Sequence, residues 1–94
     1  MEEINKIISW NNEKNELLKK ERNICFEDVL IAFQNGNVLD KMVHPNTDKY
    51  ANQQVYIIKY NDYAYLVPCV ESETELFLKT IIPSRKMTKK YLKL

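Results

Sequence analysis

The first part of the chain passes from an apolar run to a polar stretch. The run INKIISW, residues 4–10, is apolar and partly β-branched, which favours a strand. Two asparagines follow that can cap a helix, and residues 12–22 carry an acidic side chain early and basic ones late, as suits the helix dipole. Because only Leu17 and Leu18 are apolar in that stretch, the sequence predicts a largely exposed helix.

A second helix is indicated by apolar side chains spaced at i, i+3, i+4 and i+7, namely Phe26, Val29, Leu30 and Phe33. This spacing places all of them on one helix face. We expect the helix to end at the sequence Asn-Gly-Asn around Gly36, because glycine adopts the left-handed conformation without steric cost.

The second half of the chain is rich in strand-forming residues. Residues 38–52 lack sustained periodicity and predict a loop with a short strand over 38–43. Three β-rich runs follow, separated by short turns: 53–60, 63–70 and 73–82. They predict an antiparallel meander. The third run is apolar on both faces, which is typical of an interior strand, and Pro68 predicts a bulge or an unpaired edge within the second.

The chain closes with a short basic helix. Pro83 and Ser84 supply a break and an N-cap, and Met87, Tyr91 and Leu94 follow at helical spacing. The whole pattern predicts one α+β domain over residues 1–94, a small antiparallel sheet with two N-terminal helices and a C-terminal basic helix.

Composition narrows the chemistry. A chain of 94 residues that is 45% hydrophobic is expected to fold by itself, and its single glycine excludes a glycine-rich phosphate-binding loop. Cys25 and Cys69 with one histidine are too few for a zinc site, so we expect no metal and no cofactor, and two buried, reduced thiols. No leader pattern or long apolar run is present, which favours a cytoplasmic protein without membrane contact.

The charge is distributed unevenly. Residues 79–94 hold six basic side chains and no acidic one, a charge of +6; residues 1–78 hold the other 8 basic and all 13 acidic ones, so 8 − 13 = −5. The basic residues of the tail are Lys79, Arg85, Lys86, Lys89, Lys90 and Lys93. Such a block is compatible with three alternatives: it binds a phosphate backbone, it binds an acidic partner, or it is a solvated helix face.

Two motifs stand near the ends of the chain: WNNEKNELLKKERNICFEDV, residues 10–29, and TIIPSRKMTKKYLK, residues 80–93. Together they resemble the opening and the close of the BrnT-type toxins of bacterial toxin–antitoxin pairs. That family opens with Trp-Asp, a Lys three residues on, and then Lys-His-Gly-Val-Ser-Phe-Glu-Glu-Ala. The coinciding residues are Trp10, Lys14, Phe26 and Glu27, with Ile24 for Val and Asp28 for Glu, and the Arg-Lys pair of the family's close is Arg85 and Lys86.

The resemblance implies a RelE/ParE-like fold, a translation-blocking ribonuclease activity and neutralisation by a cognate antitoxin encoded beside the toxin. The chain departs from the family at three places. Arg22, within Glu-Arg-Asn, stands where the family has the His of Lys-His-Gly, so a guanidinium replaces an imidazole that can move protons. Pro83-Ser84 stands for Ser-Ala, and Tyr91 stands for an acidic residue of the last helix.

Metal-independent RNA cleavage needs a base for the 2′-hydroxyl proton, cations for the phosphorane and an acid for the leaving 5′-oxygen. Arg22 and Arg85 are our candidate phosphate clamps, and His44 or Tyr91 the candidate proton carriers. The candidate RNA-binding residues are Lys20, Lys86, Lys89 and Lys90. Each candidate also has a structural alternative. His44 is then a solvated loop residue, Arg22 complements the dipole at the end of the first helix, and Tyr91 packs against the core.

The strand tyrosines offer a further alternative, the stacking of RNA bases. They are Tyr56, Tyr60, Tyr63 and Tyr65. We expect them to alternate between the two faces of the sheet, which favours core packing and cross-strand pairs over a stacking platform.

Two function classes remain. The leading hypothesis is an endoribonuclease toxin whose partners are RNA and a cognate antitoxin. The alternative is a non-catalytic module that docks an antitoxin-like or acidic partner through its basic tail. Direct DNA binding is disfavoured because no second helix lies at helix-turn-helix spacing, so operator DNA is expected only through the antitoxin.

Overall fold

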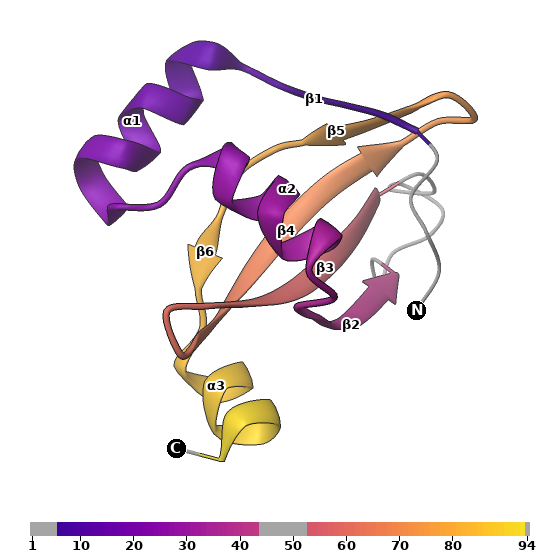
Figure 1. Ribbon diagram of the computed structural model, residues 1–94. Coiled ribbons are helices and arrows are strands. Elements are labelled where there is room, and N and C mark those ends of the chain that lie inside the picture. The colour runs from indigo at the N-terminus through magenta and orange to yellow at the C-terminus, as the bar shows by residue number, and fades with distance from the viewer. Residues whose placement is uncertain (1–5, 44–52, 94) are drawn as a thin grey trace.

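The described chain, residues 6–43 and 53–93 of a computed structural model, forms three helices around one mixed β-sheet (Figure 1). Its elements in order are β1 (Ile7–Trp10), α1 (Asn12–Arg22), α2 (Phe26–Gln34), β2 (Val38–Val43), β3 (Gln53–Tyr60), β4 (Tyr63–Glu71), β5 (Glu75–Leu78), β6 (Ile82–Pro83) and α3 (Arg85–Leu92). The predicted α+β class and the predicted order of the elements are confirmed.

The sheet has the order β1-β5-β4-β3-β2, with β6 beside β4. β3, β4 and β5 form the predicted antiparallel meander, and β2 extends it by pairing antiparallel with β3. β1, however, pairs with β5 in parallel, Ile8 opposite Leu76, so the expectation of a purely antiparallel sheet is wrong. After β1 the chain crosses over through α1 and α2 and enters the sheet at its far edge, which leaves β1 beside the last long strand. β5 is therefore interior, as its apolar character predicts.

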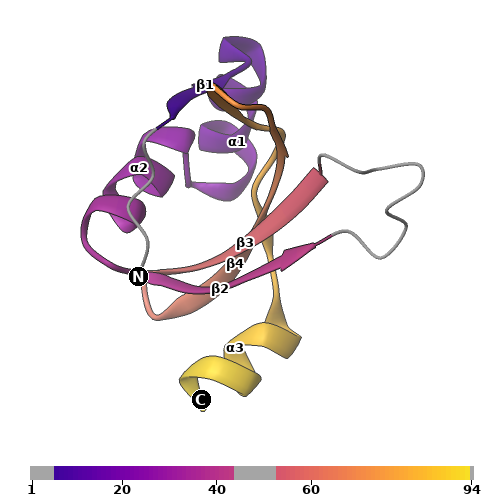
Figure 2. The ribbon, with the colours of Figure 1, turned by 90° about the vertical axis from the view of Figure 1, so that its right-hand side faces the viewer.

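The helices cover both faces of the sheet. α1 and α2 lie on one face, which we call the α1–α2 face, and α3 lies on the other, the α3 face (Figures 1 and 2). Most of the core lies on the α1–α2 face, and its buried members are Leu18, Ile24, Phe26, Val29, Ala32, Tyr56, Ile58, Val67, Cys69, Leu76, Leu78 and Ile81. On the α3 face Ile57 and Ala64 are fully buried.

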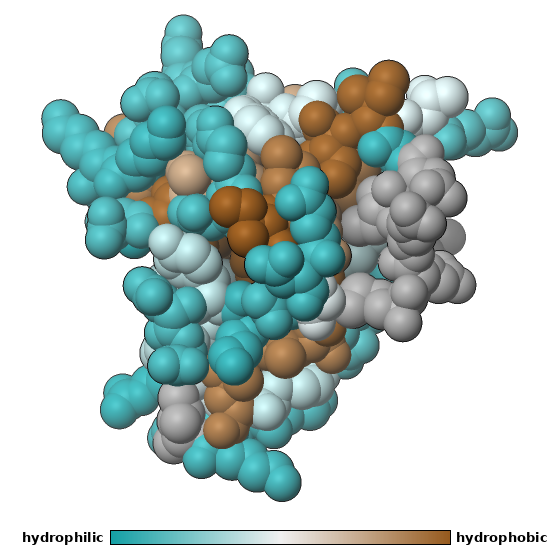
Figure 3. Space-filling view, in the orientation of Figure 1, coloured by the Kyte–Doolittle hydropathy of each residue, from teal (hydrophilic) through white to brown (hydrophobic). Residues whose placement is uncertain are grey.

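Local signals fix the helix ends as predicted. Asn11 caps α1 by accepting a hydrogen bond from the Lys14 amide at 2.9 Å, and Asn23 ends it in the left-handed conformation. α2 is followed by Gly36 with φ of 72°, the conformation expected there. α1 is largely exposed, as predicted, and Figure 3 shows mainly hydrophilic side chains over it. Of its two leucines, Leu18 is buried in the core and Leu17 is 45% exposed.

Several strand boundaries differ from the predicted runs. β1 begins at Ile7, and Ile4 lies outside the described residues. The third run divides into β5 and β6, because β4 changes its partner from one to the other. Pro68 lies at this change, where its carbonyl accepts from the Lys79 amide at 2.8 Å while its own nitrogen has no proton to donate. Pro68 forms no bulge, since it pairs in register with Val55 of β3; on its other side it lies in the unpaired gap between the β5 and β6 partners of β4.

Candidate nucleic-acid interface

α3 is fixed to the sheet at its first turn. Ser84 caps the helix by accepting from the Met87 amide at 3.1 Å, and its own amide donates to the Ala64 carbonyl at 2.9 Å. Thr88 is 4% exposed, and its hydroxyl accepts from the Ala64 amide at 2.8 Å and donates to the Ser84 carbonyl at 2.7 Å. A threonine therefore anchors a helix whose other side chains are mainly basic.

The candidate interface is the basic surface, which consists of the side chains of Lys79, Arg85, Lys86, Lys89, Lys90 and Lys93. All are exposed. The ion pairs found within residues 6–43 and 53–93 involve other lysines, so no described carboxylate lies within 4.0 Å of these six cations. Their charge is available to attract phosphates or carboxylates from outside the molecule.

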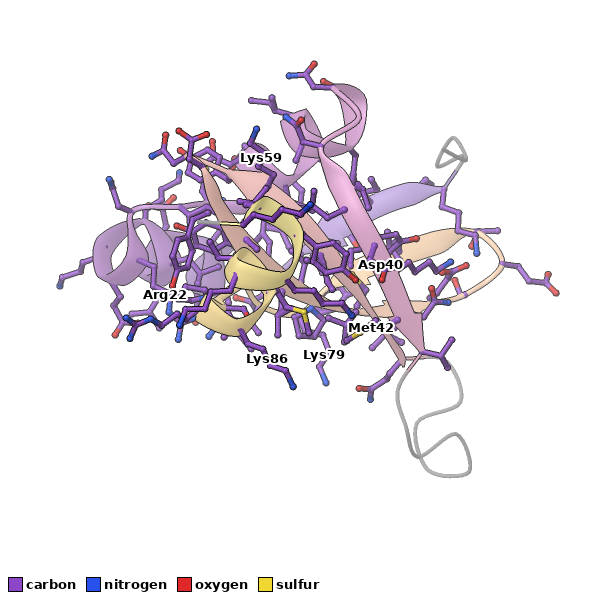
Figure 4. The ribbon with its side chains drawn as sticks, turned by 90° about the horizontal axis from the view of Figure 1, so that it is seen from below. Arg22, Asp40, Met42, Lys59, Lys79 and Lys86 are labelled. Atoms are coloured by element: carbon purple, nitrogen blue, oxygen red, sulfur yellow. The ribbon has the colours of Figure 1, made fainter. Side chains whose placement is uncertain are left out.

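Arg22 joins the end of α1 to the segment that leads into α3. Its guanidinium donates a hydrogen bond to the Ile81 carbonyl, four positions before Arg85. In Figure 4 Arg22 lies to the left of α3, and Lys86 and Lys79 lie along the lower side of that helix. Because a guanidinium has five N–H donors, the bond to Ile81 leaves others for an anion.

Tyr91 fastens the end of α3 to strand β2. Its hydroxyl donates to Asp40 Oδ2 at 2.5 Å, and the Lys90 ammonium lies 5.2 Å from the centre of its ring. This hydrogen bond raises the pKa of Tyr91 above the ordinary value and lowers the pKa of Asp40. Tyr91 therefore keeps its proton at neutral pH, which suits a proton donor and not a base.

The other predicted site residues form no described side-chain hydrogen bond with Arg22 or with the start of α3. Lys20 is exposed on α1, two positions before Arg22, and Lys89 and Lys90 are exposed in the last turn of α3. His44 lies outside the described residues. The structure therefore joins Arg22 to Ile81, just before β6, while the predicted imidazole has no described position.

The four strand tyrosines lie together on the α1–α2 face. Tyr60 is directly opposite Tyr63, and the ring centres of Tyr60 and Tyr65 are 6.0 Å apart. Tyr56 packs edge-on against Phe33 at 5.2 Å. The expected alternation between faces is wrong, because positions two or four apart in one strand share a face and the hairpin register aligns the two pairs. They form cross-strand and core contacts, the alternative that the sequence favoured over base stacking.

Sequence reasoning missed Asp40 and Thr88. Asp40 is 51 positions from Tyr91, and nothing around it in the sequence indicates that contact. Thr88 stands among the basic residues of α3 and was not singled out. The available signal was its hydroxyl, which in a helix next to a strand can form hydrogen bonds with the backbone.

Nothing in the described ranges adds a metal centre, since no group of three His, Cys, Asp or Glu side chains there is arranged to hold an ion. None of the helices in the same ranges is long and apolar enough to cross a bilayer. Comparisons with protein-family models, with curated proteins and with solved structures gave no match to this chain.

Proposed function

We propose that this protein is a cytoplasmic endoribonuclease toxin, similar to the BrnT type and of RelE/ParE-like fold, which a cognate antitoxin neutralises. The observation that carries the proposal is the basic surface, none of whose cations forms an ion pair with a described carboxylate, together with Arg22, which is hydrogen-bonded to Ile81 between Lys79 and Arg85. An RNA backbone bears one negative charge per nucleotide and gains affinity from such a surface by releasing counterions. The succession of a strand, two helices, a meander and a basic helix also supports the proposal.

In this proposal the cleavage needs no metal ion. Arg85 and Arg22 hold the non-bridging oxygens of the scissile phosphate, since a guanidinium is planar and remains charged. The 2′-oxygen attacks phosphorus and gives its proton to a base, the role of His44. The bond to the 5′-oxygen breaks, and that oxygen receives the proton of Tyr91. Lys86 and Lys89 stabilise the charge of the phosphorane.

A second candidate is the non-catalytic interaction module. It is favoured by the internal hydrogen bonds of two predicted catalytic groups, since Arg22 donates to Ile81 and Tyr91 donates to Asp40. Groups with these structural partners position α3, and the basic surface then serves to bind an acidic protein.

The test is expression of the chain alone and together with the neighbouring open reading frame, followed by growth curves and analysis of total RNA. We expect growth arrest and RNA cleavage with the chain alone and relief by the neighbour. Arg85→Ala should slow cleavage by the purified protein about 100-fold, the typical loss when one group that stabilises the transition state is removed.

The matched control is Lys19→Ala, which removes an exposed cation of α1 that pairs with Glu16. It should leave the rate within about twofold, as surface substitutions usually do. Normal growth and intact RNA with the wild-type chain would exclude the ribonuclease and leave the interaction module.

A further inference from the structure

α3 covers only part of its face of the sheet. The register aligns one row of side chains across the strands on this face: Met42 is opposite Val55, and Val55 is opposite Pro68. In the next row Val70 is opposite Phe77. We call these five residues the apolar strip.

The apolar strip is half-buried, although all its members except Met42 come from interior strands of the sheet. Ile57 and Ala64, on the same face beneath α3, are fully buried. The difference arises because α3 packs over the end of β4 where Ala64 lies and no described helix covers the strip. The whole strip crosses four strands, and three strand spacings of about 4.8 Å make it about 14 Å wide, which is enough for one more helix of about 10 Å diameter.

The rim of the strip beside α3 carries two cations, Lys79 and Lys86, and one carboxylate, Asp40, which lies on the same face as Met42 and accepts a hydrogen bond from Tyr91. The backbone of Lys79 bonds to Pro68 at the end of the row, and Lys86 lies in the first turn of α3. Figure 4, seen from the α3 side, places Lys79 and Lys86 below α3, Met42 to their right on β2 near Asp40, and Lys59 on the opposite side of the helix. Lys79 and Lys86 have no ion pair with a described carboxylate.

We propose that the apolar strip docks an acidic amphipathic helix of a partner protein, with its apolar side chains on the strip and its carboxylates against Lys79 and Lys86. This inference rests on the proposed function, in which a partner neutralises the protein, and it states the chemistry by which that partner binds. Helix-in-groove binding of this kind uses apolar anchors at i, i+3, i+4 and i+7. When the partner's carboxylates pair with Lys79 and Lys86, these two lysines are no longer available to bind RNA.

Charge and chemistry decide between this occupant and others. A second copy of the chain, placed about a two-fold axis, brings the same cationic rims together, and that repulsion disfavours it. RNA bases prefer aromatic platforms and hydrogen-bonding groups, whereas four of the five strip residues are aliphatic and only Phe77 is aromatic. An additional strand binds at a sheet edge, and the strip lies on a sheet face.

The probe is a synthetic helical peptide of about 18 residues, five turns, with leucine on one face and glutamate on the other. Titration into the ¹⁵N-labelled wild-type protein should shift the amide signals of Met42, Val55, Val70 and Phe77. The same peptide with lysine in place of glutamate should bind at least about tenfold more weakly, since charge complementarity selects the partner. Wild-type mapping does not depend on the folding of any variant.

Matched variants locate the contact. Met42→Glu places a charge in the strip and should raise the Kd for the acidic peptide at least about tenfold, as loss of an apolar anchor does. Val43→Glu is the control, because Val43 is the next residue of β2, is 62% exposed and faces the α1–α2 side; its Kd should change less than about twofold. Lys79→Glu should weaken binding, whereas Lys59→Glu, on the other side of α3, should not.

The proposal is overturned if the shifts lie on the α1–α2 face or on α3 alone, if Met42→Glu and Val43→Glu have equal effects, or if the lysine peptide binds as well as the acidic one. It is also overturned if a single-stranded RNA oligonucleotide shifts the strip amides and the acidic peptide does not. RNA cleavage is measured separately. Docking at the strip without cleavage would refute the ribonuclease alone, and cleavage without docking would refute this inference alone.

Discussion

Single polar residues with buried side chains set how the helices meet. Asn15 of α1 is 3% exposed, and its Oδ1 accepts from the Phe26 amide at 2.7 Å. Its Nδ2 donates to Glu27 Oε1 at 2.7 Å, and this hydrogen bond is the main cause of the lowered pKa of Glu27. One amide thus satisfies the first N–H of α2 and joins the two N-terminal helices.

We expect Asn15→Ala to lower the free energy of unfolding by about 2 kcal/mol, because the buried Phe26 N–H loses its acceptor. Chemical denaturation monitored by circular dichroism measures the change. Asn12→Ala is the control, since Asn12 is exposed at the start of α1, and it should cost less than about 0.5 kcal/mol. Equal losses in the two variants would show that the Asn15 hydrogen bonds contribute nothing specific.

Cys69 shows the effect of burial on a thiol. It is fully buried on the α1–α2 face, and burial raises its pKa from 9.0 to about 12. In a Cys25→Ser background we expect Ellman's reagent not to react with the native protein at pH 8 and to react fully after denaturation, because the thiolate is the reactive form. Rapid reaction of the native variant would contradict the burial of Cys69.

The same shift affects stability at alkaline pH. The pKa of Cys69 is higher in the folded state, so the stability linked to this thiol is complete below pH 9 and declines as the pH rises toward about 12. The unfolded chain ionises in that interval while the folded chain does not.

Among the elements, α3 depends most on one contact. Thr88 fills a buried position with a hydroxyl that serves both Ala64 and Ser84. Strand β4 therefore supplies a backbone N–H to a helix side chain next to the residues that pair with β6.

Thr88→Val keeps the shape of the side chain and removes the hydroxyl. We expect a loss of about 2 kcal/mol in the free energy of unfolding, because the Ala64 N–H becomes unsatisfied. Hydrogen exchange at the Ala64 amide should also become faster. Thr74→Val, at an exposed position before β5, should change neither quantity, and a similar effect at both threonines would show that the Thr88 hydroxyl is not the anchor.

At the level of elements, the helix ends could be predicted from neighbouring residues, whereas the pairing of β1 could not. The two N-terminal helices and α3 begin and end at caps that are read from neighbouring residues. The partner of β1 could not be read in this way, because nothing in residues 7–10 records whether β5 lies beside them or in which direction it runs. Parallel pairing follows from the crossover through α1 and α2.

For the whole molecule, charge is separated between a basic end and an acidic remainder, and several carboxylates have internal partners. Lys6 Nζ lies 2.6 Å from Glu71 Oε2, and this bond is the first cause of the lowered pKa of Glu71. The pKa of Asp40 is lowered by Tyr91 and that of Glu27 by Asn15. Three contacts of the folded chain therefore favour the ionised form of a carboxylate.

Acid should weaken the fold. Carboxylates whose pKa is lowered in the folded state stabilise it above their unfolded pKa values, about 4, and this stabilisation is lost as the pH falls through the folded values. We expect the denaturant midpoint to fall between pH 5 and pH 3 and Glu71→Gln to reduce that dependence. Glu13→Gln, an exposed change in the first turn of α1, should leave it unchanged. A midpoint that does not vary with pH would contradict the role of these carboxylates.

The candidate site was predictable in part. The composition of residues 79–93 identified the basic surface, since charge is a property of the chain itself. The contacts of Arg22 with Ile81 and of Tyr91 with Asp40 span 59 and 51 positions, and no local pattern encodes them. The apolar strip was also hidden, because its members come from four strands and only the register shows that they share a face.

The sequence by itself determined the helices, their caps, the β-hairpin turns and the position of the excess positive charge. These depend on interactions between residues close in the chain, such as the Asn11 cap and the left-handed Gly36. Only the tertiary structure decided which strand accompanies β1, which face of the sheet α3 covers and which apolar side chains it leaves uncovered. Those outcomes depend on contacts between distant segments, whose geometry exists only once the whole core has packed.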